Sequence, residues 1–173
     1  ILSAQSTDKL VNTVTPALFE RYPTPAALAG ADLGEVETLV RSTGFFRNKA
    51  KNIVKMAQQV VAEHGGEIPR EMDQLTSLAG VARKTANVVL NMWFHMPAQA
   101  VDTHIFRLGN RSGLAPGKDV VAVERAIEDR IPAEFQQHAH HWMILHGRYI
   151  CTARKPRCAD CLIADLCQYE DKT

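Results

Sequence analysis

The distribution of cysteine constrains this chain more than any other sequence feature. The first 150 residues contain no cysteine, and the segment that follows contains all four: Cys151, Cys158, Cys161 and Cys167. A disulfide framework is usually spread through a small secreted fold, which it cross-links. The clustering seen here instead indicates a local metal or iron–sulfur site in a reducing compartment.

The spacing of these cysteines is C-x6-C-x2-C-x5-C over 17 residues. Structural zinc sites usually consist of two C-x2–4-C pairs, and only Cys158 and Cys161 form such a pair. Four thiolates also suit a [4Fe–4S] cluster. The spacing by itself therefore leaves zinc and an iron–sulfur cluster open.

The apolar residues recur at the spacing of helices, and no segment shows the alternation typical of a strand. We predict an all-α protein, with one helix that begins at Thr7 or Asp8 and two that begin at Asp102 and Asp119 as N-caps. Other helices are expected near Val36–Val40, at Ile53–Val61 before Gly65-Gly66, at Glu71–Leu78, at Thr85–Phe94 and at Phe135–Leu145. Pro97 interrupts the pattern, so we place a domain boundary there, between residues 1–97 and 98–173.

Composition sets wide limits on function. The chain has 173 residues, 46% of them hydrophobic, which is enough for one or two small domains with a core. A formal net charge of +1 neither requires nor excludes nucleic acid, so any basic surface must be local. No apolar run approaches the roughly 20 residues that cross a membrane. The chain begins without methionine at ILSAQ, so we expect the natural N-terminus to be missing, and targeting signals cannot be judged.

The segment LAGVARKTA, residues 78–86, predicts a site for an anion. A tight turn followed by a helix leaves backbone N–H groups unpaired at the positive end of the helix dipole, which favours a phosphate. An ordinary αα-hairpin with an exposed Lys84 explains the same pattern. Asp102 is likewise explained as a helix N-cap, although a capping aspartate can also be held at a site. The residues that would contact the phosphate are Gly80, Val81, Ala82 and Arg83.

Longer segments separate these explanations. LSAQSTD (2–8), STGFFRNKAKNI (42–53), AVDTHIFRLGNR (100–111) and HHWMILHGRYICTARKPRC (140–158) follow one another in the order and at the separations typical of one family. With the hairpin and the cysteines, they resemble the endonuclease III family of helix-hairpin-helix DNA glycosylases over nearly the whole chain. The resemblance implies two helical domains with a DNA-binding cleft between them. It also implies an enzyme that removes oxidised pyrimidines from duplex DNA and cleaves abasic sites by β-elimination.

The resemblance assigns the chemistry to Lys84 and Asp102. In this family the lysine after the hairpin attacks C1′ of the damaged nucleoside, expels the base and forms a Schiff base. Asp102 would stabilise the positive charge that develops on the sugar. An amine is nucleophilic only when neutral, so we expect partial burial and the neighbouring Arg83 to favour the neutral amine. Adenine-specific mismatch glycosylases resemble this chain but lack the lysine, which favours a lyase.

Two further positions are implied to enter the DNA. A base inside a duplex is unreachable, so the target nucleotide must be flipped out of the stack. The family fills the gap with a glutamine and a bulky apolar residue, and the matching positions are Gln5 and Phe45. Phe45 replaces the expected leucine, and an aromatic wedge can stack between bases. The alternative for Phe45 is a core aromatic beside Phe46.

The resemblance also favours a [4Fe–4S] cluster over zinc at the four cysteines. Between Cys151 and Cys158, a short loop concentrates positive charge that suits DNA phosphates, and one arginine precedes it: Arg148, Arg154, Lys155 and Arg157. The histidines of HAHHW, His138, His140 and His141, do not share one helix face, and we interpret them as structural.

The hairpin departs from the family at two positions. Ala79 replaces a proline and Ala82 replaces a glycine. A hairpin glycine usually permits a positive φ or a close approach to a ligand. An alanine at residue 82 would therefore cost about 1 kcal/mol in strain or push the phosphate away, and we expect weaker binding through the hairpin.

Two other functions compete with the enzyme. A non-catalytic DNA-binding protein would use the hairpin only to hold phosphate, but that role requires neither Lys84 nor Asp102. An electron carrier built around the cluster would give the long helical segment no purpose. We expect a monomer in the bacterial cytoplasm that acts on double-stranded DNA containing damaged bases or abasic sites.

Overall fold

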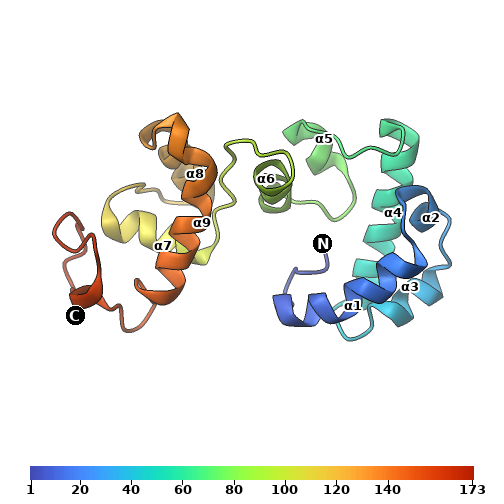
Figure 1. The fold of residues 1–173 in the computed structure, drawn as a ribbon, viewed down its shortest axis with the longest axis horizontal. Coiled ribbons are helices and arrows are strands. Elements are labelled where there is room, and N and C mark those ends of the chain that lie inside the picture. The colour runs from blue at the N-terminus through green and yellow to red at the C-terminus, as the bar shows by residue number, and fades with distance from the viewer. The chain divides into compact units, whose positions relative to one another are not determined.

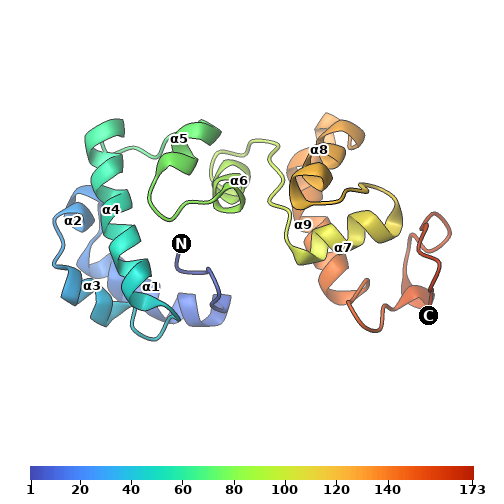
Figure 2. The ribbon, with the colours of Figure 1, turned by 180° about the vertical axis from the view of Figure 1, so that it is seen from behind.

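The computed structural model describes residues 1–173 and contains helices and no strand (Figures 1 and 2), which confirms the all-α prediction. The helices are α1 (Asp8–Arg21), α2 (Pro25–Ala29), α3 (Leu33–Leu39), α4 (Phe46–His64), α5 (Met72–Ser77), α6 (Arg83–Met92), α7 (Thr103–Ser112), α8 (Val120–Arg130) and α9 (Ala133–Tyr149). A single 3-10 turn, η1 (Cys158–Asp160), lies among the cysteines. None of these helices combines the length and the apolar character that crossing a membrane requires.

Capping side chains define the helix starts that the sequence predicted. The Thr7 hydroxyl accepts a hydrogen bond from the Leu10 N–H at 3.3 Å, and Asp102 and Asp119 cap α7 and α8 in the same way. The predicted stop of α4 is also confirmed, because Gly65 adopts a φ of 61° as its C-cap. Helix α9 is longer than expected and begins directly after Pro132.

The chain forms two compact units, residues 1–82 and 83–173. Helix α6 belongs to the second unit because its polar side chains bind the segment and helix that follow it. Asn87 donates a hydrogen bond to the Gln99 carbonyl at 3.0 Å, and Asn91 donates to the carbonyls of Ala98 and Gln137, each at 3.1 Å. These bonds span the predicted domain boundary at Pro97, which stays a prediction.

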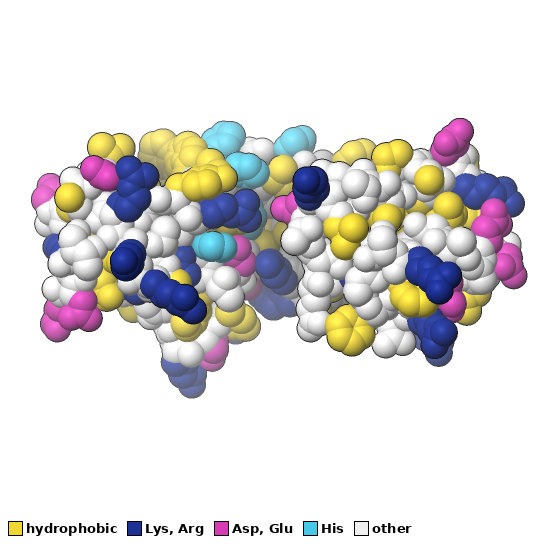
Figure 3. Space-filling model, turned by 90° about the horizontal axis from the view of Figure 1, so that it is seen from below, with side chains coloured by type: hydrophobic (Ala, Val, Ile, Leu, Met, Phe, Trp, Pro, Cys, Tyr) yellow, Lys and Arg dark blue, Asp and Glu magenta, His cyan; other side chains and the backbone are white.

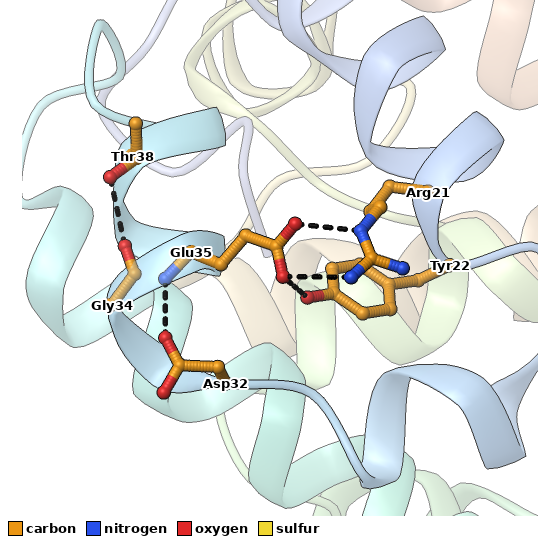
Figure 4. A network of polar contacts seen from close by, with 6 residues as sticks. All are labelled: Arg21, Tyr22, Asp32, Gly34, Glu35 and Thr38. Carbon is orange, nitrogen blue, oxygen red and sulfur yellow. Dashed lines mark hydrogen bonds and ion pairs between the residues drawn. The ribbon is translucent and has the colours of Figure 1, made fainter.

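The first unit packs around buried residues of α1, α3 and α4, among them Leu18, Val36 and Ile53. A polar network joins α1 to α3 beside this core (Figure 4). The Glu35 carboxylate accepts hydrogen bonds from Arg21 at 2.6 and 3.1 Å and from the Tyr22 hydroxyl at 2.6 Å. These bonds from Arg21 and then Tyr22 lower the pKa of Glu35.

The second unit packs α7 against α8 and α9 around Ile105, Val123, Ile127 and Met143. Helices α7 and α9 pack closely at Gly147, where an added Cβ would lie 2.8 Å from the His104 carbonyl oxygen. Only glycine permits this spacing. The contact lies two residues after Asp102 and therefore helps to fix the start of α7.

Candidate active site and cluster loop

The hairpin between α5 and α6 contains one residue in the left-handed region. Gly80 has a φ of 75°, and a Cβ there would lie 2.9 Å from the Cβ of Asn52 on α4. Ala82 has no positive φ, since the only residues other than glycine with one are Gln5, Phe45 and His95. The strain expected at Ala82 is therefore wrong, and only displacement of a phosphate by its methyl group remains to weaken binding.

Lys84 lies in the first turn of α6, before the first buried residue of that helix, Ala86. Its side chain is exposed, so the expected partial burial is wrong. Nothing of α6 precedes Lys84 except Arg83, whose guanidinium donates hydrogen bonds to the Glu124 carboxylate at 2.6 and 3.1 Å. Glu124 is buried, so the Arg83 charge is paired with a carboxylate inside the protein.

Asp102 combines a structural role with free hydrogen-bonding capacity. Its Oδ1 accepts hydrogen bonds from the N–H groups of His104 at 2.8 Å and Ile105 at 2.9 Å, which caps α7. Its second carboxylate oxygen takes no part in the cap. A half-buried carboxylate held in this way retains one oxygen for a positively charged neighbour.

The charges of Lys84 and Asp102 both act on one buried histidine of α9. His140 is 4% exposed, and its Nδ1 has no hydrogen-bond partner. Burial lowers its pKa most, and the neighbouring His141 lowers it further; Asp102 raises it and Lys84 lowers it. Lys84 and Asp102 thus lie close enough to the same imidazole to influence it, and both belong to the second unit.

The two predicted wedge residues share a cavity in the first unit. Gln5 and Phe45 adopt φ values of 54° and 56°, which are strained for residues other than glycine. Phe45 is 68% exposed, whereas Phe46 packs against the core, so the alternative of a core aromatic is wrong for Phe45. A cavity of about 240 Å³ lies between them, and its walls include Asn48, Lys49, Asn52 and Gly80.

The four cysteines surround one apolar cavity that Leu108, Ile150 and Ile163 also line. All are free thiols and half-buried. Within residues 1–173, no three His, Cys, Asp or Glu side chains converge closely enough to hold a single metal ion. Four thiols around one cavity fit a [4Fe–4S] cluster, which takes one thiolate at each iron.

Two arginines of α7 hold the cluster loop, which runs from Cys151 to Cys167. Arg107 donates to the carbonyl oxygens of Cys151 at 2.8 Å and Gly147 at 2.6 Å. Arg111 donates to those of Thr152 and Ala153 at 2.8 and 2.9 Å. Since carbonyl groups occupy these two arginines, the exposed charge of the loop comes from its own side chains.

The predicted basic residues are all exposed: Arg148, Arg154, Lys155 and Arg157. Arg157 pairs with Asp160 at 2.8 Å, and the other three form no ion pair. Figure 3 shows basic and histidine side chains together on the face of the second unit that it presents. These three unpaired cations, one at the end of α9 and two on the anchored loop, are available to phosphates.

The predicted site residues divide between the two units. Gln5, Phe45 and the hairpin residues up to Ala82 lie in the first, and the lysine, the aspartate, the cysteines and the basic loop lie in the second. Sequence reasoning missed Lys49, Arg107, Arg111 and the role of Glu124. Only the R-x3-R spacing of Arg107 and Arg111 on one helix face carried a signal.

Comparison with known proteins identifies the family of this chain. Residues 1–133 match the HhH-GPD superfamily of base excision DNA repair proteins, and residues 151–167 match the iron–sulfur binding domain of endonuclease III. Endonuclease III of Haemophilus influenzae is 51% identical over 172 residues, which cover 99% of this chain and 82% of the relative. Endonuclease III of Escherichia coli is 49% identical over the same shares of the two chains.

Solved structures extend the likeness to three dimensions. A trapped endonuclease III–DNA covalent intermediate, an estranged-adenine complex, matches with a TM-score of 0.87 and 46% identity over 96% of this chain and 79% of the other. A thermostable thymine-DNA glycosylase, 23% identical, shares the fold with a TM-score of 0.87. This chain belongs to the endonuclease III family of base excision DNA repair enzymes, with a C-terminal [4Fe–4S] ligand set.

Proposed function

We propose that this chain removes oxidised pyrimidines from duplex DNA and cleaves the resulting abasic site through a Schiff base on Lys84. The observation that carries the proposal is the exposed Lys84 at the start of α6, in the same unit as Asp102 and within electrostatic range of the same histidine. Phosphate binding alone would require only the hairpin backbone.

The amine of Lys84 acts twice. It attacks C1′ of the damaged nucleoside, and the base leaves with the electron pair of the glycosidic bond and takes up a proton. The nitrogen then loses a proton, and its electron pair breaks the bond from C1′ to the ring oxygen O4′, which takes up a proton. The open-chain iminium that results makes the adjacent C2′ proton acidic. Loss of that proton expels the 3′ phosphate by β-elimination, and water then hydrolyses the Schiff base to release the enzyme.

Asp102 supports the first step through its charge. The carboxylate oxygen that does not cap α7 is free to face the sugar, where positive charge develops as the glycosidic bond breaks. The cap holds that oxygen in place before the reaction begins, so little reorganisation is required.

The remaining site residues hold the DNA. Gln5 and Phe45 fill the gap left by the flipped nucleotide, and the hairpin and the basic loop each contact phosphates. When bound, the cluster supplies four iron–sulfur bonds that cross-link the loop from Cys151 to Cys167. Arg107 and Arg111 also hold this loop to α7.

Borohydride trapping on duplex DNA with one abasic site tests the proposal. We expect a covalent adduct with the unaltered protein and with Lys118→Ala, which removes an exposed lysine of the same unit. Lys84→Ala should form none while it still binds the DNA. A persistent adduct in Lys84→Ala would move the nucleophile elsewhere. DNA binding without any adduct from the unaltered protein would leave only a binding module.

The relatives named above are bacterial, which supports a bacterial setting for this reaction. We place the enzyme in the cytoplasm, where the chromosome lies, and we expect it to act as a monomer.

A further inference from the structure

Lys49 on α4 is a buried cation without an anion. Its side chain is 5% exposed, and it forms no ion pair. Its Nζ donates one hydrogen bond, to the Ser6 hydroxyl at 2.8 Å. Lysine is almost never buried unless it is paired, because removing its charge from water is costly. Burial accordingly lowers the pKa of Lys49.

This residue contacts both of the loops that carry the wedge residues. Its side chain holds Ser6, which directly follows Gln5. Its backbone N–H donates to the carbonyl oxygen of Phe45 at 3.1 Å. Lys49 also lines the cavity between Gln5 and Phe45, so all three residues belong to one local structure within the first unit.

The two wedge residues need such support. Both adopt the left-handed backbone conformation, and strained residues of this kind persist only where their surroundings hold them. Phe45 is the N-cap of α4 but makes no side-chain capping hydrogen bond. Gln5 lies in an exposed turn, and its neighbour Ser6 is bonded to α4 through Lys49.

We propose that Lys49 is a positioning residue that fixes the separation of Gln5 and Phe45 through Ser6, so that both side chains enter the duplex together. This inference rests on the proposed wedge function. The positioning role of Lys49 is confined to duplex DNA, because an abasic site in a single strand has no opposite base and leaves no gap to fill. Lys49 should therefore have no effect on the reaction of Lys84 with a single strand.

The test compares Schiff-base trapping rates on one abasic oligonucleotide, alone and paired with its complement. We expect Lys49→Met to lower the trapping rate on the duplex about tenfold, since a hydrogen bond to a charged group is lost. The rate on the single strand should not change. Lys55→Met, which removes an exposed lysine from the same helix, should retain both rates.

Ser6→Ala separates positioning from general stability. We expect a loss of about threefold on the duplex, and Lys49→Met combined with Ser6→Ala should be no slower than Lys49→Met alone. A 2-aminopurine opposite the abasic site should report slower wedge insertion in the same variants. If Lys49→Met does not fold, Ser6→Ala carries the same comparison.

Equal losses on the duplex and the single strand would overturn the proposal, because they would indicate damage to the fold or to Lys84. Independent, multiplying losses from the two substitutions would overturn it as well. If the proposed lyase function is itself wrong, the unaltered protein traps neither substrate, which is a different result from either of these.

Discussion

The ion pair between Arg83 and Glu124 lies immediately before the proposed nucleophile, and breaking it should destabilise the second unit. Arg83→Met leaves a carboxylate that is 4% exposed without its partner. Removing one member of a fully buried pair costs about 3–5 kcal/mol. The Arg83 side chain is 49% exposed, which reduces this figure. We therefore expect a loss of about 2 kcal/mol, in keeping with two charge-assisted hydrogen bonds.

The assay is urea unfolding of the cluster-loaded protein followed by tryptophan fluorescence. Trp93 and Trp142 are the only tryptophans, and both lie in the second unit, so the signal reports on that unit alone. With a urea m-value of about 2 kcal/mol/M, the midpoint should fall by about 1 M. Arg125→Met serves as the matched control, because Arg125 is exposed and forms no ion pair.

A double-mutant cycle with Glu124→Gln completes the test. Each substitution should destabilise the unit, and the double variant should be more stable than the sum of the single losses predicts. A coupling free energy near zero would refute the reasoning. It would show that water stabilises the Glu124 carboxylate to the same extent as Arg83 does.

Three further results are expected. Ala82→Gly should raise affinity for abasic duplex DNA in a binding titration, because it removes the methyl group from the phosphate site; an unchanged or lower affinity would contradict this. Phe45→Gly should raise the thermal stability of the first unit, since glycine adopts a φ of 56° without strain, yet it should lower the trapping rate on duplex DNA. If stability and trapping rate change in the same direction, Phe45 has no DNA-binding role separate from its effect on the fold. The pKa of Glu35 is lowered in the folded state, so its stabilising contribution is present above the ordinary glutamate pKa of about 4.3 and is lost as pH falls through the folded pKa. Acid unfolding should therefore depend less on pH in Glu35→Gln, and an identical pH profile would show that the network with Arg21 has no such role.

Local chemistry made most of the fold predictable. Asp102 and Asp119 each precede an apolar helical segment, and both are caps in the structure. Gly65 follows the last residue of α4 and adopts the left-handed conformation that ends a helix. Such signals involve residues within one turn of each other, so a single sequence contains everything that determines them.

The site was less predictable wherever contacts join distant residues. Lys84 was expected to be partly buried, but α6 begins one residue before it and leaves its side chain exposed. The bond from Lys49 to Ser6 spans 43 positions, and the pair of Arg83 with Glu124 spans 41. No local pattern specifies such partners, because they depend on how the helices pack.

The requirement for glycine at residue 147 has a genetic consequence. Most core positions of the second unit tolerate a similar apolar residue, because neighbouring side chains can rearrange. At Gly147 the opposing atoms are the carbonyl group and the Cβ of His104, and no change of rotamer moves them. In a screen for mutator strains, substitutions at this codon should therefore appear among the inactive alleles, although the residue contacts neither the thiols nor the lysine.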